Sequence, residues 1–363
     1  MRVKLKDITK FSKGTQINGK NLIDDGAYSY LNGGINPSGK WNEFNVAENT
    51  VTISEGGNSS GYVNYMNKAF WCGAHCYYLY DGPKNSKYLY YALKSQQERL
   101  FRIRSGACMP NIKKSDLGNF IIEYEKDEVR QEEVVKVLEK CELLIEDYNK
   151  KLTLLDEAVR ARFVEMFGDL RINDKGWKYY KLDELTELIT DGEHATPKRT
   201  TQGIYLLSAR NVLNHQLSLE DVDFIDCDEF DRISRRIIPK EGDVLISCSG
   251  SIGRCCIVPK NIKFQMVRSI ALLRFKSNIN PVFAEYMITS DYLQNQINKS
   301  KTASSQANLF QGKIKSLKGV VPPLELQNQF ASFVQEIDKS RLRELLAIKQ
   351  IKLLLNDSWL LLY

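Results

Sequence analysis

The sequence predicts an α+β protein with a pseudo-twofold internal repeat: two similar mixed α/β domains of short strands, separated by two long helices that form an antiparallel coiled coil. Three observations predict this fold class. Matching segments occur twice in the same order, Gly, Asn and Ser turns divide each domain into short apolar runs, and two long stretches carry a heptad stripe.

The repeat rests on segments that are weak singly but keep their order. They are "VKLKDI" (3–8) with "YKLDEL" (180–185), "NTVTISEGG" (49–57) with "GDVLISCSG" (242–250), and "RQEEV" (130–134) with "LQNQF" (326–330). The offset between copies grows from 177 to 193 to 196, and at 177 Tyr28 also aligns with Tyr205. The copies therefore share a frame and differ by insertions. We expect domains at 1–125 and 171–322 and long helices at 126–170 and 323–363.

Each predicted helix carries apolar residues at alternating steps of three and four, the pattern of a coiled-coil seam. Arg341 and Glu344 interrupt the stripe of the second helix. The simplest partner for each stripe is the duplicate helix, paired antiparallel; the alternative is that each helix packs on its own domain. The seam positions are Val134, Leu138, Ile145, Leu152, Leu155, Val159, Val334, Ile337, Ile348, Ile351 and Leu355.

Composition sets broad limits on function. The chain has 363 residues and a net charge of +6, which permits a nucleic-acid partner without requiring one. No run reaches the roughly 20 apolar residues of a membrane span, so we expect no membrane partner. Eight cysteines without a disulfide-framework spacing predict reduced thiols and a cytoplasmic protein.

The sequence lacks the phosphate-binding and dinucleotide-binding glycine motifs and the Pro-Pro-aromatic motif of adenine methyltransferases. Only three histidines occur, and "CGAHC" (72–76) has no second ligand pair at zinc-site spacing, so a buried strand is the favoured interpretation. Cys255 and Cys256 are adjacent and are expected on opposite faces of a strand. We expect no metal site and no catalytic residues on this chain.

Several blocks resemble a known family. "DGEHATP" (191–197), "GIYLLSARNV" (203–212), "GDVLISCSGSIGR" (242–254) and "VVPPLELQNQF" (320–330) stand in an order that resembles the specificity subunit of Type I restriction-modification systems, and the resemblance covers essentially the whole chain. The first repeat departs from the pattern, because "KGTQINGK" (13–20) has neither the His nor the Pro. This departure implies that the two domains read different sequences.

The resemblance implies a non-catalytic DNA-binding subunit in phage defence. Each domain would be a target-recognition domain that reads one half of a bipartite, asymmetric duplex target, while the helices set the spacer and dock two methylation subunits. No cofactor is implied on this chain: S-adenosylmethionine would bind the methylation subunits, and ATP and Mg would bind the restriction subunits. The alternatives are a coiled-coil adaptor for ligands other than DNA, a silent or recombined specificity allele, and a stand-alone enzyme, which the missing motifs disfavour.

The expected DNA contacts lie on polar and basic loops. In the second domain Arg210 suits a guanine and Asn211 an adenine, and the polar and basic residues of 196–200 suit phosphate oxygens. The candidates of 249–254 lie on a glycine-containing loop that can approach the DNA backbone closely. His194 either contacts DNA or holds its own turn. The second-domain candidates are His194, Thr196, Lys198, Arg199, Thr200, Ser208, Arg210, Asn211, Ser249, Ser251 and Arg254. The first-domain candidates, of which Trp41 suits stacking, are Lys13, Thr15, Asn18, Lys20, Asn32, Asn36, Ser38, Lys40, Trp41, Asn58, Ser59 and Tyr62.

Overall fold

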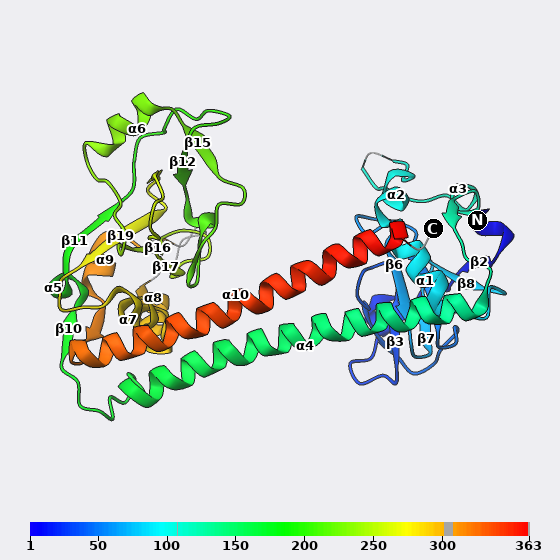
Figure 1. The fold of residues 1–363 in the computed structure, drawn as a ribbon, viewed down its shortest axis with the longest axis horizontal. Helices are drawn as coiled ribbons and strands as arrows, with labels where there is room; N and C mark the ends of the chain where they lie inside the picture. The colour runs from blue at the N-terminus through cyan, green and yellow to red at the C-terminus, as the bar shows by residue number, and fades with distance from the viewer. Residues whose placement is uncertain (107, 301–307, 362–363) are drawn as a thin grey trace. The chain divides into compact units, whose positions relative to one another are not determined.

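The chain divides into two compact units that share two long helices. The structure, a computed structural model, describes residues 1–106, 108–300 and 308–361, with side chains up to 355. Unit 1 is Met1–Asn149 with the carboxyl-terminal segment from Leu345, and unit 2 is Lys150–Glu344. The helices α4 (Glu128–Phe167) and α10 (Leu324–Leu361) each contribute one part to either unit (Figure 1). The helices are therefore parts of the two units rather than separate segments beside them.

Unit 1 combines two sheets and a short two-stranded ribbon. Its elements are β1 (Arg2–Lys4), η1 (Leu5–Asp7), β2 (Lys10–Lys13), η2 (Gly19–Asn21), β3 (Tyr28–Leu31), β4 (Gly39–Trp41), β5 (Thr50–Ser54), β6 (Val63–Met66), β7 (Phe70–Cys72), β8 (Cys76–Tyr80), α1 (Ser86–Lys94), α2 (Gln97–Arg102), α3 (Lys114–Gly118) and β9 (Ile121–Glu123). The antiparallel sheet has the order β2-β8-β5-β6, and the second sheet has the order β4-β3-β7. β1 pairs with β9, so the two ends of the domain meet.

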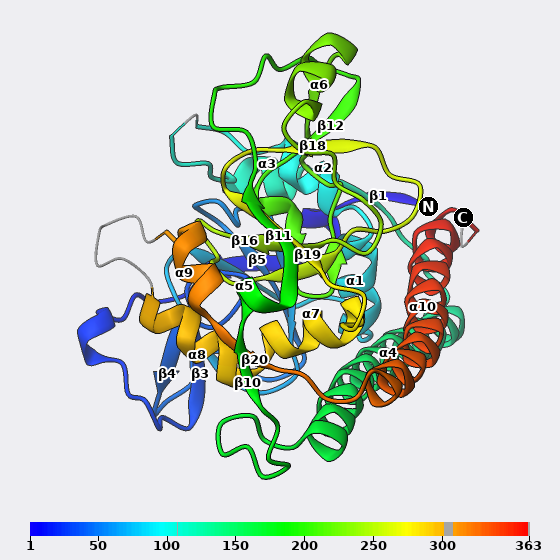
Figure 2. The same ribbon diagram turned by 90° about the vertical axis from the view of Figure 1, so that its left-hand side faces the viewer.

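Unit 2 repeats this plan with additions. Its elements are β10 (Tyr179–Lys181), α5 (Leu182–Leu185), β11 (Thr186–Asp191), β12 (Ile204–Leu207), η3 (Ala209–Asn211), β13 (Val212–Leu213), β14 (Gln216–Leu217), β15 (Asp223–Ile225), α6 (Cys227–Ser234), β16 (Val244–Ser247), β17 (Cys255–Ile257), β18 (Phe264–Met266), β19 (Ile270–Phe275), α7 (Pro281–Thr289), α8 (Asp291–Ser300), α9 (Gln311–Ser316) and β20 (Lys318–Val320). The sheets have the orders β11-β19-β16-β17 and β15-β12-β18, and β10 pairs with β20. Figure 2 shows α6 at the end of the unit opposite β10 and β20.

These strand orders confirm the internal repeat, because each sheet of unit 1 has a counterpart of the same order in unit 2. The registers correct one alignment. The Gly73 N–H donates to the Leu31 carbonyl, and the Val267 N–H donates to the Leu207 carbonyl. Leu31 therefore corresponds to Leu207, one residue away from the register that aligns Tyr28 with Tyr205. The β13–β14 hairpin and α6 have no counterpart among the described elements of unit 1.

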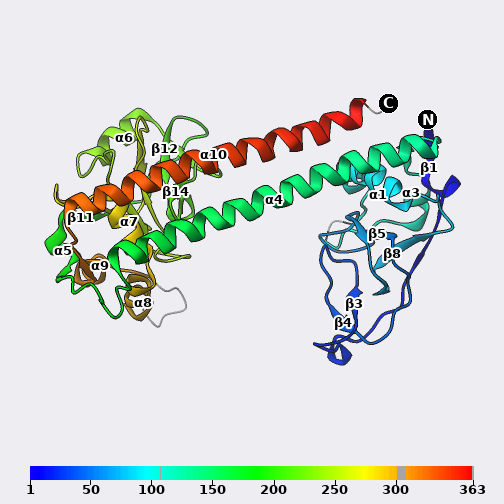
Figure 3. The same ribbon diagram turned by 60° about the horizontal axis from the view of Figure 1, so that its bottom comes forward.

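In unit 1 the helix α1 lies between the larger sheet and α4 (Figure 3). The Tyr91 hydroxyl donates to the Glu142 carboxylate at 2.7 Å. Val134 and Leu138 of α4 belong to the buried core of the unit, and Leu355 of α10 packs against the same core. Apolar positions of both long helices thus complete the core of unit 1.

In unit 2 the helices meet at four phenylalanines. The ring centroid of Phe330 lies 5.4 Å from that of Phe163 and 5.5 Å from that of Phe167, and Phe283 of α7 lies 4.7 Å from Phe167. All four side chains are buried. Further along, Arg341 of α10 pairs with Asp156 of α4 at 2.6 Å. Because residue numbers rise along one helix as they fall along the other, the helices are antiparallel here.

All eleven predicted seam positions are buried or half-buried. The two alternatives for helix packing are both realised: Phe163 contacts Phe330 of the other helix and also Phe283 of the domain. The coiled coil and the domain cores are therefore continuous within each unit.

Candidate nucleic-acid interface

The loops that carry the second-domain candidates are joined at the turn between β18 and β19. The Arg268 N–H donates to the Glu193 carbonyl at 2.9 Å. Ser269 accepts from the Ala209 N–H through its hydroxyl at 3.0 Å and from the Cys248 N–H through its carbonyl at 2.8 Å. One turn therefore fixes three loops from distant parts of the sequence. We call residues 192–203, 208–211, 248–254 and 267–269 the recognition loops of unit 2.

Helix α6 holds the first of these loops. Glu229 is buried at 7% exposure, accepts from the Arg232 guanidinium at 2.9 Å on each oxygen, and accepts the Lys198 N–H at 3.1 Å. The Arg236 guanidinium donates to the Gly192 carbonyl at 3.0 Å. The hydrogen bonds from Arg232, and then that of the Lys198 amide, lower the pKa of Glu229 to about 2. The Glu229–Arg232 ion pair therefore fixes the loop 192–203, which is the first of the recognition loops.

This contact predicts a pH-dependent contribution to stability. The folded pKa of Glu229 is depressed, so its contribution is present above the unfolded value of about 4.3 and is lost as pH falls through about 2. Glu229→Gln is expected to lower the free energy of unfolding by about 1–2 kcal/mol at pH 7, and the difference from wild type should shrink as urea unfolding is repeated from about pH 5 downward. Glu241→Gln, at an exposed pair with Lys260, is the control. A difference that stays constant with pH would contradict the assignment.

Two candidate arginines share one carboxylate. Asp223 accepts from Arg199 Nε at 3.0 Å and pairs with Arg210 Nη2 at 3.2 Å, and Asp221 lies 3.6 Å from Arg210 Nε. Both guanidinium side chains are nearly half exposed, at 46% and 45%. The arginines are held in place by acidic neighbours, and a guanine contact by Arg210 has to compete with Asp223.

The structure corrects the assignment of Asn211 as an adenine contact. Its side chain is fully buried; Oδ1 accepts from the Ser208 N–H at 2.9 Å, and Nδ2 donates to the Ser218 carbonyl at 3.1 Å. A residue whose amide is used on both sides inside the protein does not reach an adenine. Asn211 instead closes the segment that displays Arg210.

We therefore expect Asn211→Ala to act on folding. The Ser208 N–H and the Ser218 carbonyl would lose the buried amide as their partner, which predicts a loss of about 2–3 kcal/mol in the free energy of unfolding. Chemical denaturation of the purified chain measures it, with Asn278→Ala at an exposed turn as a control. An unchanged stability together with altered DNA sequence preference would restore the base-reading hypothesis.

The other second-domain candidates differ in their surroundings. His194 is exposed, and its Nε2 lies 3.6 Å from Asp191 Oδ2, so a role at the turn and a role toward DNA both fit. The Thr200 hydroxyl donates to the Gln202 carbonyl at 2.8 Å and stabilises the loop itself. Thr196 and Lys198 are exposed.

The loop after β16 holds the remaining three candidates. Ser249 is half-buried and forms a β-bridge with Asn308, whereas Ser251 is exposed. The Arg254 N–H donates to the Ser247 hydroxyl at 3.0 Å, and Arg254 is half-buried. Ser208 caps the neighbouring short helix through Asn211 and is also half-buried. Ser251 and Arg254 therefore remain candidates for a DNA contact.

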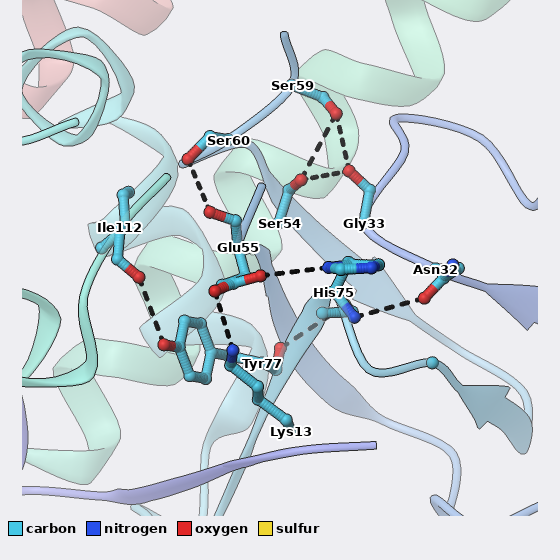
Figure 4. Close-up of polar contacts among 12 residues, drawn as sticks. Lys13, Asn32, Gly33, Ser54, Glu55, Ser59, Ser60, His75, Tyr77 and Ile112 are labelled. Carbon is cyan, nitrogen blue, oxygen red and sulfur yellow. Dashed lines mark hydrogen bonds and ion pairs between the residues drawn. The ribbon is translucent and has the colours of Figure 1, made fainter. Parts of the chain in front are cut away.

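Unit 1 has an equivalent centre at the turn between β7 and β8, where Glu55 receives contacts from three directions (Figure 4). Its N–H donates to the His75 carbonyl at 2.8 Å, and its carboxylate pairs with Lys13 Nζ at 2.7 Å and with His75 Nδ1 at 3.3 Å. Asn32 Oδ1 accepts the His75 N–H at 3.2 Å. The candidates Lys13 and Asn32 are thus brought together.

Two first-domain candidates stabilise turns. The Asn18 side chain accepts the Lys20 N–H at 3.1 Å and caps a short helix. The Ser59 hydroxyl donates to the Gly33 carbonyl at 2.6 Å, beside Ser54 (Figure 4). Ser59 is half-buried and Asn18 is exposed. Both side chains stabilise turns, and a DNA contact by either stays a prediction.

The two aromatic candidates, Trp41 and Tyr62, also make contacts within the protein. Trp41 packs edge-to-face on Trp71 with centroids 6.4 Å apart, and both are half-buried. The ring of Tyr62 lies under Lys94 Nζ at 3.7 Å. These contacts favour structural roles over insertion between bases. The exposed first-domain candidates are Lys13, Thr15, Asn18, Lys20, Asn36, Ser38, Lys40 and Asn58.

Sequence reasoning missed the charged residues that organise both centres. Glu55, Asp223 and Glu229 hold the basic side chains, and Arg268 projects from the central turn. A signal for Arg268 was present, because it interrupts the apolar run "FQMVRSIALL" at the end of a buried strand. The acidic residues have no such signal.

Five of the eight cysteines are buried and pack in the cores of the two units, namely Cys72, Cys76, Cys248, Cys255 and Cys256. Among the described residues no group of three His, Cys, Asp or Glu side chains is placed to hold a metal ion. Cys255 and Cys256 pack into different cores, on opposite sides of their strand as predicted. Burial raises the pKa of the Cys248 thiol to about 12, so this group is a thiol rather than a thiolate at neutral pH.

Two like units, each with polar loops bonded to a strand-connecting turn and each including part of the same two helices, define a two-domain repeat protein. The chain belongs to the family of the Type I restriction modification DNA specificity domain, which matches residues 1–155 and 174–353. Putative type I specificity subunits of Mycoplasma pneumoniae and Mycoplasma genitalium are 33% and 32% identical to it over 209 and 201 residues, which is 50% and 48% of this chain. The chain spans about half the length of these relatives, 56% and 52%.

Solved structures share the fold. The S subunit of a Type I restriction-modification system from M. genitalium superposes with a TM-score of 0.61 at 19% identity, covering 98% of this chain and 94% of that one. A chain from a structure of complex assembly and conformational transition in the type I R-M system superposes with a TM-score of 0.53 at 14% identity, covering 98% and 95%. The fold of the whole described chain is therefore that of these proteins.

Proposed function

We propose that this chain is the DNA sequence-specificity subunit of a Type I restriction-modification complex. The observation that carries the proposal is the repeated centre: in each unit a strand-connecting turn ties several polar and basic loops into one surface. Each unit reads one half of a bipartite, asymmetric duplex target. The two surfaces differ in residues, so the half-sites differ in sequence.

The long helices set the number of base pairs between the half-sites. α4 runs without interruption for 40 residues, a rise of about 60 Å. An uninterrupted helix is a stiff connector, because every backbone N–H inside it is bonded to its own chain. The spacing between half-sites is therefore fixed by helix length rather than by a flexible linker.

The helices also dock two methylation subunits. Apolar side chains outside the seam are exposed on both helices, an arrangement that suits contact with partner proteins. S-adenosylmethionine binds those subunits, ATP and Mg bind the restriction subunits, and this chain is non-catalytic. These exposed residues include Val137 (58%), Leu143 (60%), Leu144 (47%), Leu342 (58%), Leu346 (49%) and Leu353 (51%).

The complex acts on DNA in the cytoplasm. No helix among the described residues has the length and apolar character of a membrane span. The charge of +6 supplies only part of the attraction to DNA, so the partners contribute to tight binding.

The test is a map of adenine methylation in cells that co-express this chain with its methylation subunits. A new bipartite motif that is absent without this chain supports the proposal and identifies both half-sites. A stable complex that methylates nothing and shows no salt-dependent DNA binding contradicts it, and favours an adaptor for other ligands.

A further inference from the structure

The arginines of the recognition surface of unit 2 fall into two groups. Arg199 and Arg210 share Asp223, and Arg232 is held by Glu229. The half-buried Arg254 forms no ion pair with a described residue. Arg268 is exposed and likewise forms no ion pair or side-chain hydrogen bond with a described residue. Its charge is therefore not already neutralised by the protein.

The backbone of Arg268 is fixed from several sides. Its own N–H is bonded to Glu193, the preceding Val267 N–H donates to the Leu207 carbonyl at 3.0 Å, and the Ile270 N–H closes the turn on the Val267 carbonyl at 3.0 Å. Because the backbone is already fixed, binding has to order only the side chain and not the loop as well. Arg268 is thus an exposed arginine without an ion pair, at the turn where the recognition loops meet.

We propose that Arg268 reads a guanine in the half-site bound by unit 2, donating two hydrogen bonds to O6 and N7 in the major groove. The inference rests on the proposed function and extends it to one residue. Arg210 is less suited to this role, because a base contact has to replace its contact with Asp223. Arg268 gains two strong acceptors without breaking an ion pair.

The internal repeat also identifies the residue of unit 1 that is equivalent to Arg268. Because Gly73 corresponds to Val267 in the strand register, Ala74 stands where unit 2 has Arg268. Alanine offers no donor beyond its backbone. The half-site read by unit 1 therefore lacks this guanine contact, and the change of one residue at equivalent turns contributes to the asymmetry of the target.

The test compares Arg268→Ala and Arg268→Lys with wild type, each assembled with the methylation subunits. We expect discrimination at one guanine of one half-site to fall by about 5- to 100-fold in both variants, since lysine keeps the charge but not the planar fork. The other half-site and the spacer should be unchanged in the methylation map. Arg235→Ala, an exposed and unpaired arginine at the end of α6, is the matched control and should leave the motif unchanged.

Two outcomes would overturn the inference while leaving the proposed function intact. Uniform weakening on all sequences, with a salt slope reduced by about 1, would make Arg268 a phosphate contact. An unchanged motif with unchanged affinity would remove Arg268 from the interface. If wild type itself yields neither a motif nor salt-dependent DNA binding, the proposed function fails together with this inference. Thermal unfolding of each variant confirms that its fold is intact.

Discussion

Inserting one heptad into each long helix is expected to lengthen the spacer of the DNA target by about three base pairs. Seven helical residues add about 10 Å, and each base pair of DNA rises about 3.4 Å. The insertions belong between Asn149 and Lys150 and between Glu344 and Leu345, where the helices pass from one unit to the other. Each inserted segment should repeat the seam, so that the apolar stripe stays in register. Methylation mapping of the assembled complex measures the result.

The matched control replaces seven residues at each place by the same segments without changing helix length. It should preserve both half-sites and the spacer. An insertion in α4 alone should instead disturb helix pairing and lower the free energy of unfolding, because seam positions lose their partners. A spacer that is unaltered by the double insertion would eliminate the helices as its determinant, and an altered half-site would show that helix length acts on the recognition loops.

Phe330→Ala is expected to lower the free energy of unfolding by about 3–5 kcal/mol. The ring is fully buried and touches Phe163 and Phe167 of α4 as well as Tyr286 of α7, with centroids 5.2–5.5 Å away. Its removal leaves a cavity where helix packing and the core of unit 2 meet. Urea unfolding of the purified chain, followed by circular dichroism, measures the change.

Leu342→Ala is the control for this substitution. It lies on the same helix but is 58% exposed, so its effect should stay within about 0.5 kcal/mol. A loss below about 1 kcal/mol for Phe330→Ala would mean that the four phenylalanines do not carry the association of α10 with unit 2.

The repeat and the long helices were predictable because their signals are local and periodic. The heptad stripe alone identifies residues such as Val134 and Leu152 that are buried or half-buried in the structure. The matched segments also reproduce equivalent features: Ser54 and Ser247 end corresponding strands β5 and β16. The one-residue error at Tyr28 arose where the copies differ in loop length, since an insertion can be placed on either side of a short strand.

The recognition surface was predictable as a set of loops and not residue by residue. Lys198 and Arg199 are bonded to Glu229 and Asp223, which lie 31 and 24 residues further along the chain. Polar residues in loops often bond to the backbone of their own turn rather than to a ligand. Asn211 is an example. Only the three-dimensional pairing of charges distinguishes a free arginine from one that is already engaged.

Unit 2 is one uninterrupted stretch of chain, whereas unit 1 is completed by residues from both ends of the sequence. In terms of connectivity, unit 2 is an insertion within the helical part of unit 1. A genetic exchange of the segment encoding residues 150–344 would therefore replace one recognition surface with both of its own helix portions, and would leave two junctions inside regular helix. An equivalent exchange of unit 1 requires two separate segments. Gene conversion would thus alter the half-site of unit 2 more readily than that of unit 1.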